Sequence, residues 1–83
     1  MLKIAEYNKK TGKKIELEEL EKYKFNFDGW IYVYGQNRFT GLRVEPRSRR
    51  IGLYNSADII VEKETMNILY DLINDGYVEK VEI

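Results

Sequence analysis

The stretch ETMNILYDLINDG, residues 64–76, contains the clearest periodic pattern in the chain and decides its fold class. Its apolar residues recur at the i, i+3, i+4 and i+7 spacing of one helix face, at Met66, Leu69, Tyr70 and Ile73. Leu72 widens this apolar stripe. Gly76 stands where a residue in the left-handed conformation commonly ends a helix. The pattern predicts a helix from about Glu64 to Asp75 that packs one face on a core.

Short strands are predicted on both sides of this helix. The strongest is WIYVY, residues 30–34, which is entirely aromatic or β-branched. Turn residues such as Asn, Asp, Gly and Pro separate it from the other predicted strands, which span 2–7, 13–17, 39–45, 50–54, 58–62 and the C-terminal residues. One or two helical turns are predicted from Leu17 to Lys24.

This order of elements predicts an α+β fold, with residues 1–83 forming a single small domain. We expect an antiparallel or mixed sheet of about five to six short strands, with one main helix in the C-terminal half packed on one face. Most strands precede the helix, which disfavours a doubly wound fold. No apolar run approaches the roughly 20 residues of a membrane helix, so no membrane contact is expected. The lack of cysteine fits a reducing cytoplasm.

The residue content argues against catalysis. The chain has neither histidine nor cysteine, and its two serines, Ser48 and Ser56, therefore have no histidine to activate them. The six glycines do not have the spacing of a phosphate-binding loop. We therefore expect a protein that is not an enzyme and has no cofactor and no metal site.

Charge is distributed unevenly along a chain whose net charge is zero. Residues 38–50 hold five arginines against one glutamate, a net charge of +4, whereas residues 58–83 hold seven acidic residues against two lysines, a net charge of −5. All the arginines lie in the first of these segments, at Arg38, Arg43, Arg47, Arg49 and Arg50. The turn around residues 46–49 would form a hairpin tip whose planar guanidinium groups bind carboxylate or phosphate. The alternative is a solvated turn with weak surface ion pairs.

The aromatic strand has two possible orientations. If Ile31 and Val33 face the helix, then Trp30, Tyr32 and Tyr34 line an open sheet face beside the arginines, as in a stacking surface for single-stranded nucleic acid. The alternative places Trp30 in the core with the tyrosines at its rim. The sequence favours this second arrangement.

Acidic residues near the end of the predicted helix form a third candidate surface. Asp71 and Asp75 lie one turn apart, and the helix dipole favours cations at that end. Either the arginine turn folds over to neutralise them, or the face stays acidic for a basic partner. Self-association through the opposite charge patches is a further option.

These patterns favour a small binding module that acts through protein–protein contact. An inhibitor or adaptor of a host protein, encoded by a phage or mobile element, would fit the small size and the composition. The residues expected to bind are the tip arginines first, then the aromatic strand and the remaining arginines: Arg47, Arg49, Arg50, Tyr32, Tyr34, Arg43 and Arg38. The alternative is a nucleic-acid-binding protein that uses the same residues, although such proteins are usually basic overall.

Overall fold

The predicted helix is present in the computed structural model, which describes residues 1–37, 40–55 and 63–82. Helix α1 spans Lys63–Asn74. Gly76 follows it with φ 89°, and the N–H groups of Tyr77 and Gly76 donate to the carbonyls of Leu72 and Ile73 at 2.9 and 3.2 Å. These two bonds form the Schellman motif, which satisfies carbonyls at the helix end. The predicted cap is thereby confirmed.

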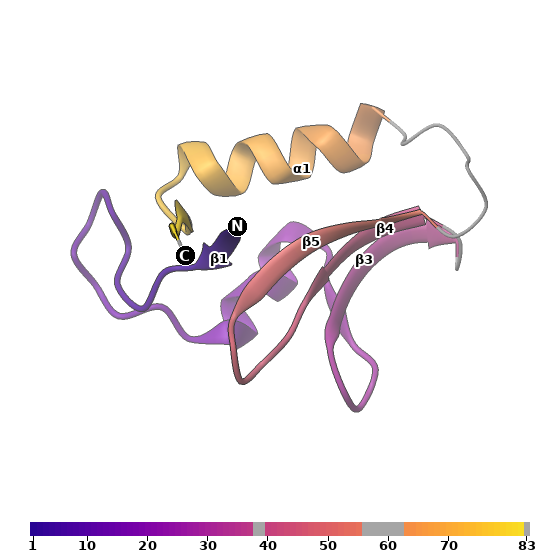
Figure 1. The fold of residues 1–83 in the computed structure, drawn as a ribbon, viewed down its shortest axis with the longest axis horizontal. Helices are drawn as coiled ribbons and strands as arrows, with labels where there is room; N and C mark the ends of the chain where they lie inside the picture. Colours follow the sequence, from indigo (N-terminus) through magenta and orange to yellow (C-terminus); the bar gives the residue numbers. More distant parts are fainter. Residues whose placement is uncertain (38–39, 56–62, 83) are drawn as a thin grey trace.

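A six-stranded antiparallel sheet forms the second layer, so the expected α+β fold is confirmed. Its strands stand in the order β2-β3-β4-β5-β1-β6. The bounds are β1 Leu2–Ile4, β2 Asn26–Phe27, β3 Tyr32–Asn37, β4 Thr40–Val44, β5 Arg50–Asn55 and β6 Val78–Lys80. The first and last strands are neighbours, and the N–H of Val81 donates to the carbonyl of Met1 at 2.8 Å. The two ends of the chain therefore lie close together (Figure 1).

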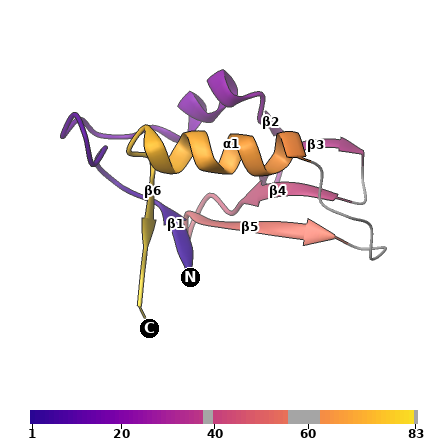
Figure 2. The same cartoon turned by 90° about the horizontal axis from the view of Figure 1, so that it is seen from above.

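Helix α1 lies over one face of the sheet, with the 3-10 helix η1, Leu17–Tyr23, beside it (Figures 1 and 2). The core between these layers is apolar, and its fully buried members are Phe25, Ile4, Ile15, Leu20, Leu42, Leu72 and Val44. Each fully buried aliphatic side chain contributes roughly 1.5–3 kcal/mol. Strand β4 shows the expected alternation, since Leu42 and Val44 are buried while Arg43 is exposed. The face that carries Arg43 is the outer face of the sheet.

The N-terminal segment differs from the prediction. Strand β1 ends at Ile4 instead of Tyr7, and the predicted hairpin is reduced to one bridge between Tyr7 and Lys14. The carbonyls of Ala5 and Ile15 accept hydrogen bonds from the Arg49 side chain, so part of the expected strand pairing is replaced by a side chain. The two-residue strand β2 was not predicted. The strand predicted over 58–62 lies outside the described residues.

None of the helices in the described part of the chain has the length and apolar character of a membrane-spanning segment.

Candidate functional site

The three arginines at the turn between β4 and β5, Arg47, Arg49 and Arg50, do not all point into solvent. Arg49 has φ 63° and turns its guanidinium inward, where it donates to the carbonyls of Ile4, Ala5 and Ile15 at 3.2, 3.0 and 2.9 Å. The expectation that Arg49 projects from the tip is therefore wrong. Its guanidinium holds the N-terminal segment against the β4–β5 turn, because it supplies donors to three partly buried backbone carbonyls.

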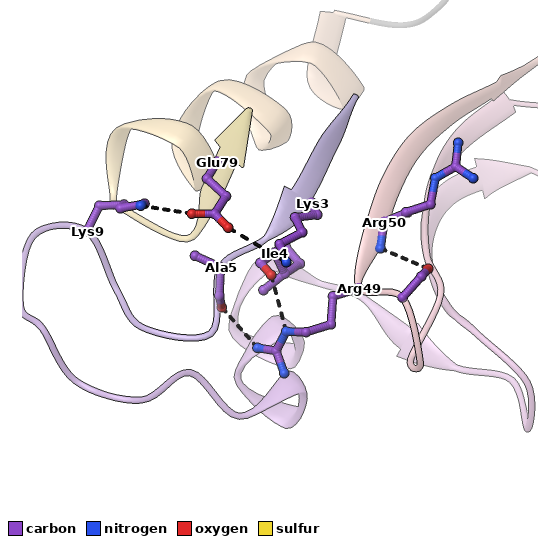
Figure 3. Close-up of polar contacts among 8 residues, drawn as sticks. Lys3, Ile4, Ala5, Lys9, Arg49, Arg50 and Glu79 are labelled. Carbon is purple, nitrogen blue, oxygen red and sulfur yellow. Dashed lines mark hydrogen bonds and ion pairs between the residues drawn. The ribbon is translucent and has the colours of Figure 1, made fainter. Parts of the chain in front are cut away.

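Other arginines of the predicted set do reach solvent. Arg43, Arg47 and Arg50 are exposed, whereas Arg38 lies outside the described residues. Arg49 and Arg50 point apart in Figure 3, the first toward the carbonyls of Ile4 and Ala5 and the second away from them. Arg49 therefore has a structural role, whereas its sequence neighbour Arg50 lies on the surface.

The aromatic strand has neither of the predicted orientations. Tyr32 and Tyr34 are each only 7% exposed, and their rings pack against Phe27 and Phe25 with centroids 4.9 and 5.9 Å apart. Burial, together with the nearby carboxylates of η1, raises the pKa of Tyr32. The two tyrosines therefore belong to the core and cannot form an open stacking face. Strand β3 begins only at Tyr32, so Trp30 stands outside the sheet alternation on which both predictions depended.

Trp30 is the most prominent side chain of the described surface. It is 85% exposed, and its neighbour Phe27 is 52% exposed. The Asp28 carboxylate fixes the backbone beneath it, because Asp28 Oδ1 accepts the N–H groups of Trp30 and Ile31 at 3.1 and 3.0 Å. The same two hydrogen bonds, that from Ile31 foremost, lower the pKa of the Asp28 carboxyl. Gly29 completes the turn with φ 99°, a conformation that glycine adopts at little cost.

The turn of Trp30 and the arginine turn lie at the same end of the sheet. Strand pairing shows this, because Tyr32 opposes Val44 in β4 and Val44 opposes Ile51 in β5, so residues 28–31 and 45–49 leave the sheet at the same end. Both turns extend from this end in Figure 1. We call the two turns, residues 28–31 and 45–49, the turn end of the sheet. It combines the exposed indole of Trp30 with the exposed guanidinium of Arg47.

The acidic candidates lie at the C-terminal end of α1, where Asp75 contacts η1. The Tyr23 hydroxyl donates to Asp75 at 2.6 Å, and the Tyr77 hydroxyl donates to Glu19 at 3.1 Å. Asp71 is exposed. Within residues 1–37, 40–55 and 63–82, no arginine pairs with Asp71 or Asp75. A tyrosine hydroxyl, and not the arginine turn, is therefore the observed partner of Asp75.

The outer face of the sheet carries mixed charge. The Glu79 carboxylate forms ion pairs with the ammonium groups of Lys9 and Lys3, at 2.8 and 3.9 Å (Figure 3). The hydrogen bond from Lys9 lowers the pKa of the Glu79 carboxyl. A separate shallow hollow is lined by Arg43, Glu45, Arg50, Ile51, Gly52 and Leu53. In the part of the chain that the structure describes, no group of three or more acidic side chains is arranged to hold a metal ion.

No protein-family model, no curated protein and no solved structure matches the chain. The fold and the exposed side chains of the small α+β protein are therefore the basis for a functional proposal.

Proposed function

We propose that this chain is a non-catalytic protein-binding module that docks through the turn end of the sheet, with Trp30 as its anchor. The observation that carries the proposal is the 85% exposure of an indole on a turn whose backbone is already fixed by Asp28. Tryptophan and arginine are enriched among residues that dominate protein interfaces. A preformed turn also reduces the ordering cost of binding.

Arg47 extends the proposed contact beyond Trp30. Its exposed guanidinium lies on the second turn of the same sheet end, where it can bind carboxylates or carbonyls of a partner. An inhibitor or an adaptor works in this manner, by covering a surface of another protein without changing it chemically. The absence of histidine and cysteine supports a binding function, and the lack of cysteine is also the basis for placing the module in the cytoplasm.

Nucleic-acid binding is the competing function, and the geometry favours it less. The two tyrosines proposed to stack on bases are buried, and the chain carries no net positive charge. Titration with single-stranded RNA and DNA across a salt series tests it directly. Binding with a salt slope of several phosphate contacts, lost in an Arg43, Arg47 and Arg50 triple alanine variant, would replace the protein-binding proposal.

The proposed docking site can be tested with Trp30→Ala and a matched control. Tyr70 on α1 is 65% exposed, so Tyr70→Ala removes another exposed aromatic ring from a different element of the fold. Partners captured by the wild-type protein from cells that express it should also bind the Tyr70 variant. The Trp30 variant should bind at least about 30-fold more weakly, the loss typical of an interface hot spot. Equal binding by both variants would refute the anchor role.

Fluorescence gives an independent measurement at the same residue. Trp30 is the only tryptophan in the chain, so all indole emission reports on this turn. A purified partner that covers Trp30 should shift the emission to shorter wavelength and protect it from a soluble quencher. A partner that binds without either effect would place the interface elsewhere.

A further inference from the structure

Gly52, in the middle of β5, has no function within the fold itself. It is not among the described glycines with positive φ, which are Gly12, Gly29 and Gly76. The pairing of β4 with β5 continues without a bulge through Arg43↔Gly52. A Cβ atom built on Gly52 would meet nothing within 4 Å. A glycine at position 52 is therefore not required by a positive φ angle, by a β-bulge or by close contact with a neighbouring atom.

Gly41, on the neighbouring strand, is a useful contrast. A Cβ atom there would collide with the carbonyl of Tyr34 and lie 2.8 Å from the hydroxyl of Tyr54. The fold thus requires a glycine at position 41. A glycine inside a strand costs about 0.5–1 kcal/mol relative to alanine, and one without an internal reason often marks a place where another molecule approaches the backbone.

Two arginines flank the open backbone of Gly52. Arg43 is its direct partner in β4, and Arg50 precedes it by two residues in β5. Strand alternation places all three on the outer face, opposite the buried Val44 and Ile51. The same residues line the hollow described above. Within the described residues, no hydrogen bond or ion pair engages the guanidinium of Arg43 or Arg50.

We propose that the hollow over Gly52 binds an acidic segment of a protein partner, with carboxylates held by Arg43 and Arg50 and the partner's chain lying against the Gly52 backbone. Each guanidinium offers a planar pair of donors that matches a carboxylate. The chain carries no net positive charge, which disfavours a continuous phosphate backbone, whereas a short carboxylate-bearing segment needs only the two guanidinium groups of the hollow. The partner chemistry is inferred on the basis of the proposed protein-binding function, but the hollow is a separate surface from Trp30.

The test uses a capped hexaglutamate peptide as the probe and nitrogen-15 NMR as the readout. The peptide should shift the amide signals of Arg43 and Gly52 and the side-chain signal of Arg50. Gly52→Val should weaken this binding at least 10-fold, because the new side chain fills the floor between the arginines. Its thermal midpoint should not fall, because the valine has open space and suits a strand. This combination separates a blocked site from a damaged fold.

Matched variants and a second probe complete the test. Arg43→Ala and Arg50→Ala should each weaken peptide binding, whereas Lys63→Ala removes an exposed positive charge on α1, over the opposite face of the sheet, and should leave it unchanged. Equal losses in all three variants, or undiminished binding by Gly52→Val, would overturn the proposal. So would an oligothymidine probe that shifts these signals where hexaglutamate does not. Capture of a partner that depends on Trp30 but not on Gly52 would refute this inference alone and leave the proposed function intact.

Discussion

The hydroxyl of Tyr23 donates a hydrogen bond of 2.6 Å to the carboxylate of Asp75, and so joins η1 to the C-terminal end of α1. Helix α1 has no basic residue in its last turn, where the helix dipole would favour one. The tyrosine hydroxyl stabilises the carboxylate there without a cation. Burial, followed by this hydrogen bond and the charge of Asp75, raises the pKa of Tyr23.

Tyr23→Phe should therefore lower the free energy of unfolding and weaken its dependence on alkaline pH. At pH 7 we expect a loss of about 1–2 kcal/mol, less than for a buried hydrogen bond to a charged group because this one is exposed to solvent. Unfolded tyrosine ionises near pH 10. Because the folded pKa is higher, the contribution of Tyr23 is complete below about pH 10 and declines as the pH rises further. Urea unfolding between pH 7 and pH 11 measures both effects.

Tyr70→Phe is the control for this experiment, since Tyr70 is an exposed tyrosine on α1. Loss of the Tyr70 hydroxyl should change the free energy of unfolding by no more than about 0.5 kcal/mol. Burial also raises the pKa values of Tyr32, Tyr54 and Tyr77, so the Tyr23 variant should keep part of the alkaline decline. An unchanged pH profile in Tyr23→Phe would contradict the assigned coupling.

Arg49→Ala should be strongly destabilising, unlike the loss of its neighbour Arg47. The variant leaves the carbonyls of Ile4, Ala5 and Ile15 without their guanidinium donors. We expect a cost of about 2–3 kcal/mol, since unsatisfied, partly buried acceptors are expensive. Arg47→Ala, at an exposed position of the same turn, should stay within about 0.5 kcal/mol of wild type. Comparable midpoints of thermal unfolding for the two variants would show that Arg49 has no structural role.

Arg49 also shows where prediction from sequence fails. Its three acceptors come from positions 4, 5 and 15, more than 30 residues away in the chain, and no local pattern indicates that they meet. Arg43, Arg47 and Arg50 are exposed as expected because neighbouring turn and strand positions determine their direction. The exposed arginines were thus predictable, and the structural one was not.

The helix and the aromatic strand differ in how well the sequence predicted them, and the reason is again how local the decisive contacts are. The helix over 63–74 was predicted from an apolar period of about two turns, residues 66–73, and its glycine cap depends only on neighbouring residues. The predicted apolar face was wrong, because Met66, Tyr70 and Ile73 are 44%, 65% and 47% exposed whereas Leu72 is fully buried. The strand WIYVY is apolar on both of its faces, so its pattern could not tell which face is buried. Hydrogen bonds from the Asp28 turn keep Trp30 outside the strand, and this removed the alternation on which the orientation was judged.

Leu72 and Ile73 are adjacent in α1 and test its buried face. Leu72 is fully buried, whereas Ile73 is 47% exposed. Leu72→Ala should lower the free energy of unfolding by about 3 kcal/mol, through lost burial and the cavity that remains. Ile73→Ala should cost less than about 1 kcal/mol, since half of its surface already contacts water. Urea unfolding of the two variants checks the orientation of the helix, and a reversed order of costs would show that it is rotated.

Gly76→Ala should be more destabilising than Gly12→Ala, although both glycines have positive φ, of 89° and 73°. The left-handed conformation costs an alanine about 1–2 kcal/mol at either position. A Cβ atom at Gly12 meets nothing within 4 Å, whereas one at Gly76 would collide with Oδ1 of Asn8. That oxygen accepts the N–H of Lys10 at 2.7 Å, so the alanine would also disturb a buried hydrogen-bonding side chain.

A double variant isolates this collision. If contact with Asn8 causes the extra loss, Gly76→Ala should cost less in an Asn8→Ala background than in the wild-type protein, because residues in contact have non-additive effects. Gly12→Ala should be less sensitive to that background, because its Cβ atom would touch no neighbour. Urea midpoints for the wild type, the three single variants and the two double variants, at equal m-values, give the two coupling energies. Strict additivity at Gly76 would mean that backbone conformation alone sets its cost.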